Sequence, residues 1–140
     1  MVEIEIAYRG ELGCVAKHGP SAQTLFTDAP VDNKGKGQAF SPTDLVATAL
    51  GTCMLTLMGI RAEERSWSIE GAGVVVRKHM TTTLPRRIEK LDVSVRVPTG
   101  ASLSAEARSV LEQAANTSPV RLSILAAIEV PVSFEWGTAR

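Results

Sequence analysis

The sequence predicts an α+β fold with the order β-β-β-α-β-β-α-(α)-β, over a single domain that covers residues 1–140. Three observations predict this fold. Strand-like alternation occurs at both ends and in the middle of the chain, a long uncharged helix follows the first strands, and a second, amphipathic helix comes later. Strands grouped in hairpins and separated by only two main helices indicate α+β, not a doubly wound parallel sheet.

The first 40 residues predict three strands and a loop. Apolar and polar residues alternate over residues 2–9, which is typical of a half-buried strand. Residues 12–16 continue that pattern on a second strand, so the two form a hairpin, and residues 23–27 favour a short third strand. Residues 28–39 are rich in Pro, Gly, Lys and Asn, which predicts a loop that leads into the central helix.

The stretch 41–65 predicts a long central helix. Ser41 is placed as the N-cap, Pro42 takes the first helical position, and Asp44 follows the cap by three residues. No charged residue occurs from there to Ile60, which predicts a helix buried nearly all round in a soluble fold. Small residues recur on one face and would let a second helix approach closely; they are Thr48, Thr52, Thr56 and Gly59.

The second half predicts two strands, two helices and a last strand. Residues 74–76 are strand formers, and residues 91–97 alternate between apolar and polar. Residues 103–115 have helical spacing, and Ser118 before Pro119 is typical of a second helix start. Residues 128–136 alternate again, and Pro131 places this strand near a sheet edge because proline cannot donate to the ladder.

Composition excludes several classes of function. The 15 basic residues equal the 15 acidic ones, so no global field favours nucleic acid or an anionic membrane. The N-terminal residues lack a signal-peptide pattern, and we therefore expect a cytoplasmic protein whose thiols stay reduced. The two cysteines and two histidines lack zinc-site spacing, and no phosphate or dinucleotide fingerprint is present, so neither metal nor cofactor is expected.

Cys53 is the leading candidate for chemistry. It lies about three turns inside the central helix, too far from the N-terminus for the helix dipole to activate the thiol. A cation from another segment would have to favour the thiolate, which is the reactive form. Seven basic residues are available for this role: Arg9, Lys34, Lys36, Arg77, Arg86, Arg87 and Arg121. The alternative is that Cys53 is a small buried hydrophobe, and Cys14 is also expected to pack rather than react.

The segments TDAP and GKGQAFSPTDLVATALGTCMLTLM resemble the OsmC/Ohr family of osmotically inducible and organic hydroperoxide resistance proteins. The resemblance rests on a proline near the start of a long helix and on the pattern from Leu45-Val46-Ala47 to Gly51-Thr52-Cys53. It implies an intertwined homodimer with two central helices and active sites at the subunit interface. It also implies that Cys53 attacks hydroperoxides, organic ones preferred, that a second cysteine forms a disulfide with it, and that an arginine oriented by a glutamate stabilises the thiolate.

The sequence departs from that scheme and resembles an OsmC-like subgroup that lacks the second cysteine. Ser118 occupies the position of the second cysteine, and Thr43, followed by Asp44, occupies that of the glutamate. Arg9, Lys34 and Lys36 are the basic residues we expect to activate the thiol. Two hypotheses follow. The first is a one-cysteine peroxidase that uses an external thiol reductant, with a substrate pocket lined by apolar residues such as Phe40, Leu50, Met54 and Leu57. The second is a non-catalytic dimer that binds a small apolar ligand at its interface.

Overall fold

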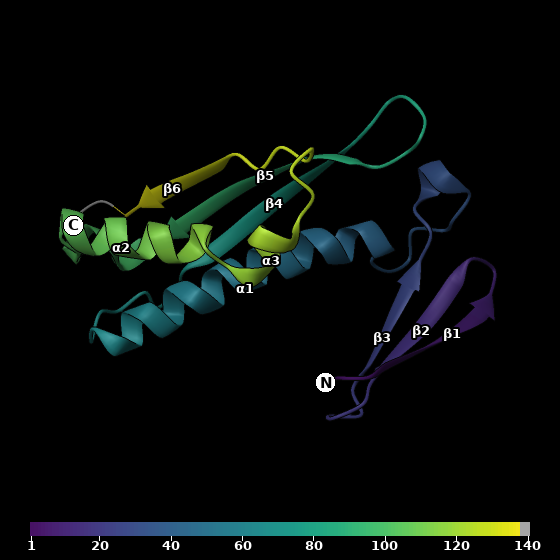
Figure 1. The fold of residues 1–140 in the computed structure, drawn as a ribbon, viewed down its shortest axis with the longest axis horizontal. Helices are drawn as coiled ribbons and strands as arrows, with labels where there is room; N and C mark the ends of the chain where they lie inside the picture. The colour runs from purple at the N-terminus through teal and green to yellow at the C-terminus, as the bar shows by residue number, and fades with distance from the viewer. Residues whose placement is uncertain (138–140) are drawn as a thin grey trace. The chain divides into compact units, whose positions relative to one another are not determined.

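The computed structural model describes residues 1–137 and confirms the α+β class and the predicted order of elements (Figure 1). The chain divides into two compact units, Met1–Val46 and the part from Ala47 onward. Each unit contains one three-stranded sheet. The single-domain assignment stays a prediction.

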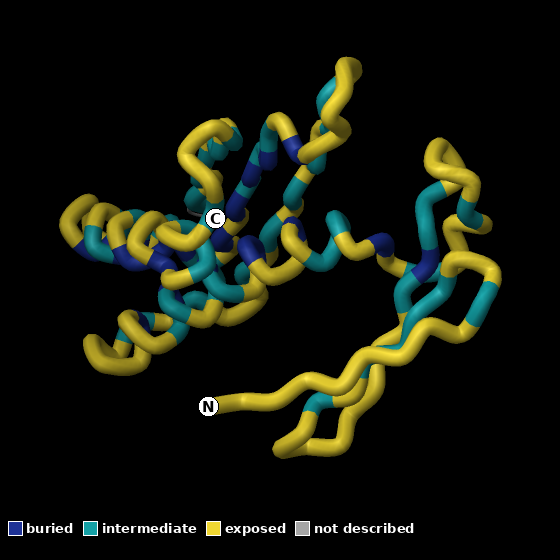
Figure 2. The backbone as a smooth tube through the Cα atoms, turned by 45° about the vertical axis from the view of Figure 1, so that its right-hand side comes forward, coloured by how far each residue is buried: buried dark blue, intermediate teal, exposed yellow. Residues whose placement is uncertain are grey.

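The first unit contains an antiparallel sheet with strand order β1-β2-β3. The strands are β1 (Ile4–Gly10), β2 (Gly13–His18) and β3 (Thr24–Asp28). The second strand begins one residue later than Leu12, because Leu12 adopts a positive φ of 66° in the turn. Figure 2 shows most of this sheet as exposed.

Both faces of the first sheet carry exposed apolar side chains. Cross-strand partners share a face, so the register places one set of side chains together: Ile4, Ile6, Tyr8, Cys14, Ala16, His18, Leu25 and Thr27. On this face Ile6 is 70% exposed and Tyr8 is 66% exposed. The opposite face carries Phe26, which is 63% exposed and lies across from Val15. Within the first unit, residues 1–46, neither face is therefore covered.

The loop after β3 includes a short 3-10 helix, η1 (Val31–Asn33), and leads into α1 (Pro42–Glu64). The predicted helix start is confirmed. The Ser41 backbone N–H donates to the Asp44 carboxylate at 2.8 Å, and the Asp44 N–H donates to the Ser41 hydroxyl at 3.2 Å. These two reciprocal bonds satisfy backbone donors that an uncapped helix end would leave unpaired.

The second unit contains a sheet with the order β4-β5-β6. The strands are β4 (Gly73–Met80), β5 (Ile88–Val97) and β6 (Val132–Trp136). The first two are antiparallel, whereas β6 is parallel to β5 and forms an edge, as predicted. The last strand is shorter than the alternation suggested. Residues 128–131 instead run beside β5, where the Leu91 N–H donates to the Glu129 carbonyl at 2.8 Å.

Two helices cover one face of this second sheet (Figure 1). One is the greater part of α1, and the other is α2 (Ala105–Asn116), which follows the 3-10 helix η2 (Pro98–Ser102). Ser104 caps α2 through the Ala107 N–H. The short helix α3 (Pro119–Ser123) begins at Ser118, whose hydroxyl accepts from the Arg121 N–H, so the predicted cap is confirmed.

The hydrophobic core lies between these helices and the sheet. Its fully buried side chains come from α1, β5 and α2 and include Leu50, Met54, Met58, Leu91, Val93, Val97 and Leu111. Gly51 allows α1 to approach β4, since a Cβ at that position would lie 3.0 Å from Val76 and 3.1 Å from Val74. By length and mean hydropathy α1 would also pass for a membrane span, a test that core helices of soluble proteins pass too.

The central helix is buried along one side rather than all round. Its exposed residues form a continuous stripe, which we call the open side of α1: Thr48, Ala49, Thr52, Thr56, Ile60 and Glu63. The sequence run without charges gave no sign of this division, because its apolar and small residues are distributed around the whole helix.

Candidate functional site

The thiol of Cys53 lies in the middle of α1, at the border between its buried and open sides. The residues four before, three after and seven after it are Ala49, Thr56 and Ile60, which are all exposed. Cys53 itself is half-buried and forms no disulfide. The thiol is therefore neither sealed in the core nor fully in solvent, which permits contact with a small molecule.

Ser118 is fully buried, and its hydroxyl has a structural role as the N-cap of α3. A serine cannot form a disulfide, so the residue at this position cannot pair with an oxidised Cys53. The degenerate glutamate position, Thr43, lies in the first turn of α1, where its hydroxyl is 3.1 Å from that of Ser41. The neighbouring Asp44 is used by the helix cap. The polar residues at these family positions thus serve helix starts.

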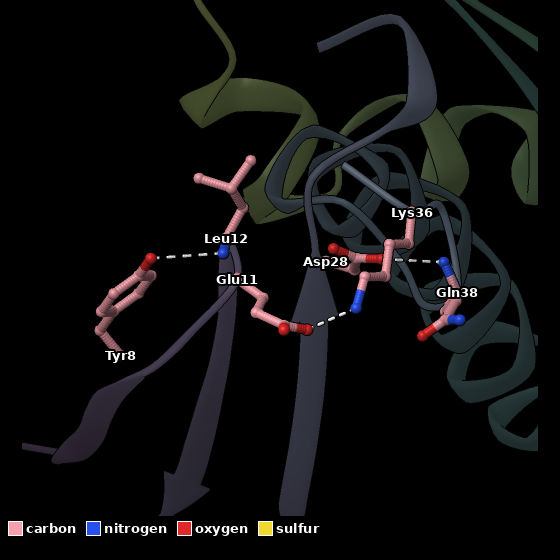
Figure 3. A network of polar contacts seen from close by, with 6 residues as sticks. All are labelled: Tyr8, Glu11, Leu12, Asp28, Lys36 and Gln38. Atoms are coloured by element: carbon pink, nitrogen blue, oxygen red, sulfur yellow. Dashed lines mark hydrogen bonds and ion pairs between the residues drawn. The ribbon is translucent and has the colours of Figure 1, made fainter. Parts of the chain in front are cut away.

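The three basic residues expected to activate the thiol lie in the first unit, whereas Cys53 belongs to the second. Arg9 is exposed on β1, and Lys34 is exposed at the end of η1 with a positive φ of 65°. Lys36 forms an ion pair with Glu11 (Figure 3). The assignment of any of them to the thiolate stays a prediction.

The pair of Lys36 and Glu11 belongs to a small polar network that orders the loop before α1 (Figure 3). Hydrogen bonding and charge attraction from Glu11 raise the pKa of Lys36, and the same interactions from Lys36 lower the pKa of Glu11. In the same loop the Gln38 N–H donates to the buried Asp28 carboxylate at 3.0 Å. Lys36 is therefore paired within its own unit, and its role at the thiolate stays a prediction like those of Arg9 and Lys34.

Two of the four residues predicted to line an apolar pocket lie in the hydrophobic core instead. Leu50 and Met54 are fully buried in the hydrophobic core, and they therefore do not line an open pocket. Leu57 is half-buried, and Phe40 is 52% exposed in the other unit. The helical spacing could not tell pocket-facing from core-facing residues, since the central helix is apolar on both sides.

Cys14 and the histidines lie apart from any group that could hold a metal. Cys14 is half-buried on β2, where it faces Tyr8 across the strand pair. His18 shares a hydrogen bond of 2.6 Å with Ser21, and His79 is exposed on β4. Among residues 1–137, no three His, Cys, Asp or Glu side chains come together as a potential metal site.

From Thr48 to Ile60 the open side of α1 carries no charge, and the hydroxyls of Thr52 and Thr56 are bonded within the helix. The Thr52 hydroxyl donates to the Thr48 carbonyl at 2.8 Å, and the Thr56 hydroxyl donates to the Thr52 carbonyl at 2.8 Å. Both hydroxyls are satisfied within the helix, so the methyl groups remain for packing. A Cβ at Gly59, one turn further along, would meet nothing within 4 Å. This surface can therefore receive a second helix at short range.

The family model for OsmC-like proteins matches residues 35–133, which is more than half of the chain. A solved structure from Psychrobacter arcticus 273-4, described as a putative osmotic stress induced and detoxification response protein, is 38% identical with a TM-score of 0.88, and 96% of each chain is covered. No protein of curated function matches the sequence.

More distant structures share the fold. An organic hydroperoxide resistance protein OsmC from Legionella pneumophila is 16% identical with a TM-score of 0.76, and 96% of each chain is covered. A putative organic hydroperoxide resistance protein from Vibrio cholerae O1 biovar eltor str. N16961, with captopril bound in one of its active sites, is 20% identical with a TM-score of 0.74; the match covers 96% of the present chain and 90% of the other. These matches place the chain in a class of small α+β proteins that share this fold. The chain belongs to the OsmC-like family.

Proposed function

We propose that this protein is a one-cysteine hydroperoxide reductase, with Cys53 as the nucleophile and organic hydroperoxides as preferred substrates. The observation that carries the proposal is the half-buried Cys53, which forms no disulfide and lies on a helix within the family match. Two structurally similar proteins are described as organic hydroperoxide resistance proteins, which supports a peroxide-related role.

The proposed reaction begins when the Cys53 thiolate attacks the O–O bond of ROOH. The sulfur takes the terminal OH and becomes a sulfenic acid, and the RO⁻ leaving group takes a proton to give the alcohol. An external thiol then condenses with the sulfenic acid, which forms a mixed disulfide and releases water. A second external thiol releases the Cys53 thiol and forms a disulfide with the first. In each cycle the Cys53 sulfur gives two electrons to the peroxide and regains two from the external thiols.

The reductant is external because the chain offers serine at the position of the second cysteine. Ser118 is fully buried and caps α3, so it neither supplies a thiol nor is free to move toward one. This arrangement favours a small thiol or a reduced partner protein over an internal disulfide.

We also propose that the active unit is a homodimer in which a second copy covers the open side of α1. The satisfied hydroxyls of Thr52 and Thr56 and the empty space beside Gly59 support close helix packing there. The exposed apolar residues on both faces of the first sheet support burial against another copy. A second copy would also bring another Arg9, Lys34 and Lys36, the cations proposed to stabilise the Cys53 thiolate.

The test compares wild type with Cys53→Ser in cumene hydroperoxide consumption with dithiothreitol as reductant. Cys14→Ser serves as the matched control, since Cys14 is also half-buried but lies on β2. We expect Cys53→Ser to fall to the uncatalysed background, and Cys14→Ser to keep its activity. Trapping with dimedone should label Cys53 alone after one equivalent of peroxide. Equal rates for wild type and Cys53→Ser would refute the enzyme and leave the alternative, a dimer that binds a small apolar ligand.

A further inference from the structure

We infer that a hollow between α1 and α2 binds a small organic oxyanion, a carboxylate or phosphate group carried on a short apolar body. The hollow has a volume of about 410 Å³ and lies wholly within the second unit. Its lining comes from the C-terminal parts of both helices and the residue that follows each of them: Arg61, Arg65, Val110, Gln113, Ala114 and Thr117. This volume is in the range of small-molecule sites, which is roughly 300–1,000 Å³.

The two guanidinium groups give the hollow its charge. Arg61 uses one nitrogen to bond Glu64 at 2.6 Å, an exposed pair that stabilises the fold little, and keeps its other donors for a ligand. Arg65 lies over the Trp67 ring at 5.5 Å, and within residues 1–137 it has no carboxylate partner. Of the side chains described in residues 1–137, no carboxylate lines the hollow. A planar guanidinium fork matches the oxygens of carboxylate and phosphate, so the site favours an oxyanion.

The helix ends do not need these arginines for capping. At the end of α1 the Trp67 N–H donates to the Ala62 carbonyl at 2.9 Å, and at the end of α2 the Thr117 N–H donates to the Gln113 carbonyl at 3.1 Å. These bonds satisfy carbonyls that would otherwise compete for the guanidinium donors. The arginine donors that do not contact Glu64 therefore remain available to a ligand.

The floor of the hollow determines the rest of the ligand. Val110 is half-buried and Ala114 is buried, so together they present an apolar surface. The Thr117 hydroxyl donates to the Gln113 carbonyl, so toward a ligand its oxygen can only accept a hydrogen bond. The side-chain amide of Gln113 can donate one. We expect the oxyanion between the guanidinium groups and a few methylenes on the floor.

The experiment titrates the intact ¹⁵N-labelled protein at low ionic strength with acetate, hexanoate and hexyl phosphate. Saturable shifts should be confined to the backbone amides of the lining residues. Hexanoate should bind more tightly than acetate, by roughly fourfold for each methylene that is buried. The ranking of hexanoate and hexyl phosphate identifies the head group, and saturable binding of either at the hollow supports the site.

The double variant Arg61→Gln/Arg65→Gln should weaken hexanoate binding about tenfold or more, because it removes the charge-assisted bonds. Arg96→Gln is the control; Arg96 is an exposed arginine paired with Glu135 on the sheet of the second unit. It should bind as wild type does, and urea unfolding should show that all variants are folded. Cys53→Ser should also bind normally, which separates this site from the proposed peroxidase. Equal binding of acetate and hexanoate, shifts spread over the surface, or equal weakening by Arg96→Gln would overturn the inference.

Discussion

Gly59→Ala tests whether the open side of α1 is covered by a second copy of the chain. Within this chain the new methyl group would meet no atom within 4 Å. Alanine is favoured over glycine in a helix interior by about 1 kcal/mol. If this helix face is free, the free energy of unfolding should therefore rise by about that amount. If a second helix packs closely on Gly59, the variant should instead associate more weakly. An added methyl group at a tight contact costs about 1–3 kcal/mol. Such a cost raises the dimer Kd by roughly 5- to 150-fold.

The measurement is sedimentation equilibrium over a wide concentration range, with urea unfolding at two protein concentrations. We expect Gly59→Ala to weaken the dimer, and the unfolding midpoint to depend on protein concentration. Gly51→Ala is the matched control. Its methyl would press on Val76 and Val74 from 3.0 and 3.1 Å, so its effect arises within one chain and should not depend on concentration. A Gly59→Ala protein that is about 1 kcal/mol more stable and associates as wild type does would refute the proposed helix contact.

Three further perturbations test other parts of the structure. Met54→Ala should lower the free energy of unfolding by about 2–5 kcal/mol in a urea titration, because Met54 is fully buried in the core. Glu11→Gln should return the Lys36 pKa toward its ordinary value of 10.5, as measured by NMR of the side chain. The stabilisation from this pair is present above the unfolded Glu11 pKa, ordinarily 4.5, and is lost as pH falls through its lowered folded value; it is also lost as pH rises through the raised Lys36 value. Ile6→Glu should reduce dimerisation in the sedimentation assay, because it places a charge on a surface that we propose a second copy covers. If Ile6 is not covered, the free energy of unfolding should change by no more than about 0.5 kcal/mol and dimerisation should not change.

Local patterns predicted the elements of the fold well because each is set by nearby residues. The cap of Ser41 and Asp44 and the cap at Ser118 depend on bonds over three residues, and the structure contains both. The edge position of β6 was predictable from Pro131, whose ring removes the ladder donor.

The parts that depend on distant contacts were not predictable. The helical run 45–60 has small or apolar residues on all sides, so nothing in it separates the core-facing Leu50 and Met54 from the open side of α1. The inward positions of β5 also depart from simple alternation. The neighbours His79 and Met80 of β4 pair with Lys90 and Ile88 of β5. Glu89, between these two, has no partner on β4 and forms a bulge, which shifts the alternation by one residue. The arginine hollow was missed because its two sides are about 50 residues apart in the chain.

The burial within each unit of the chain is our reason for proposing a second copy. The second unit has a core of fully buried side chains from two helices and a sheet. The first sheet has only three strands and leaves apolar side chains exposed on both faces, including Ile6 and Phe26. Such a sheet is marginal in water unless something packs on it. In a two-fold dimer each copy both gives and receives the same cover, so one interface would bury two such sheets at once. Stability of the first unit and delivery of its cations to Cys53 would then depend on the same association. A monomeric variant should therefore lose peroxidase activity even with Cys53 intact.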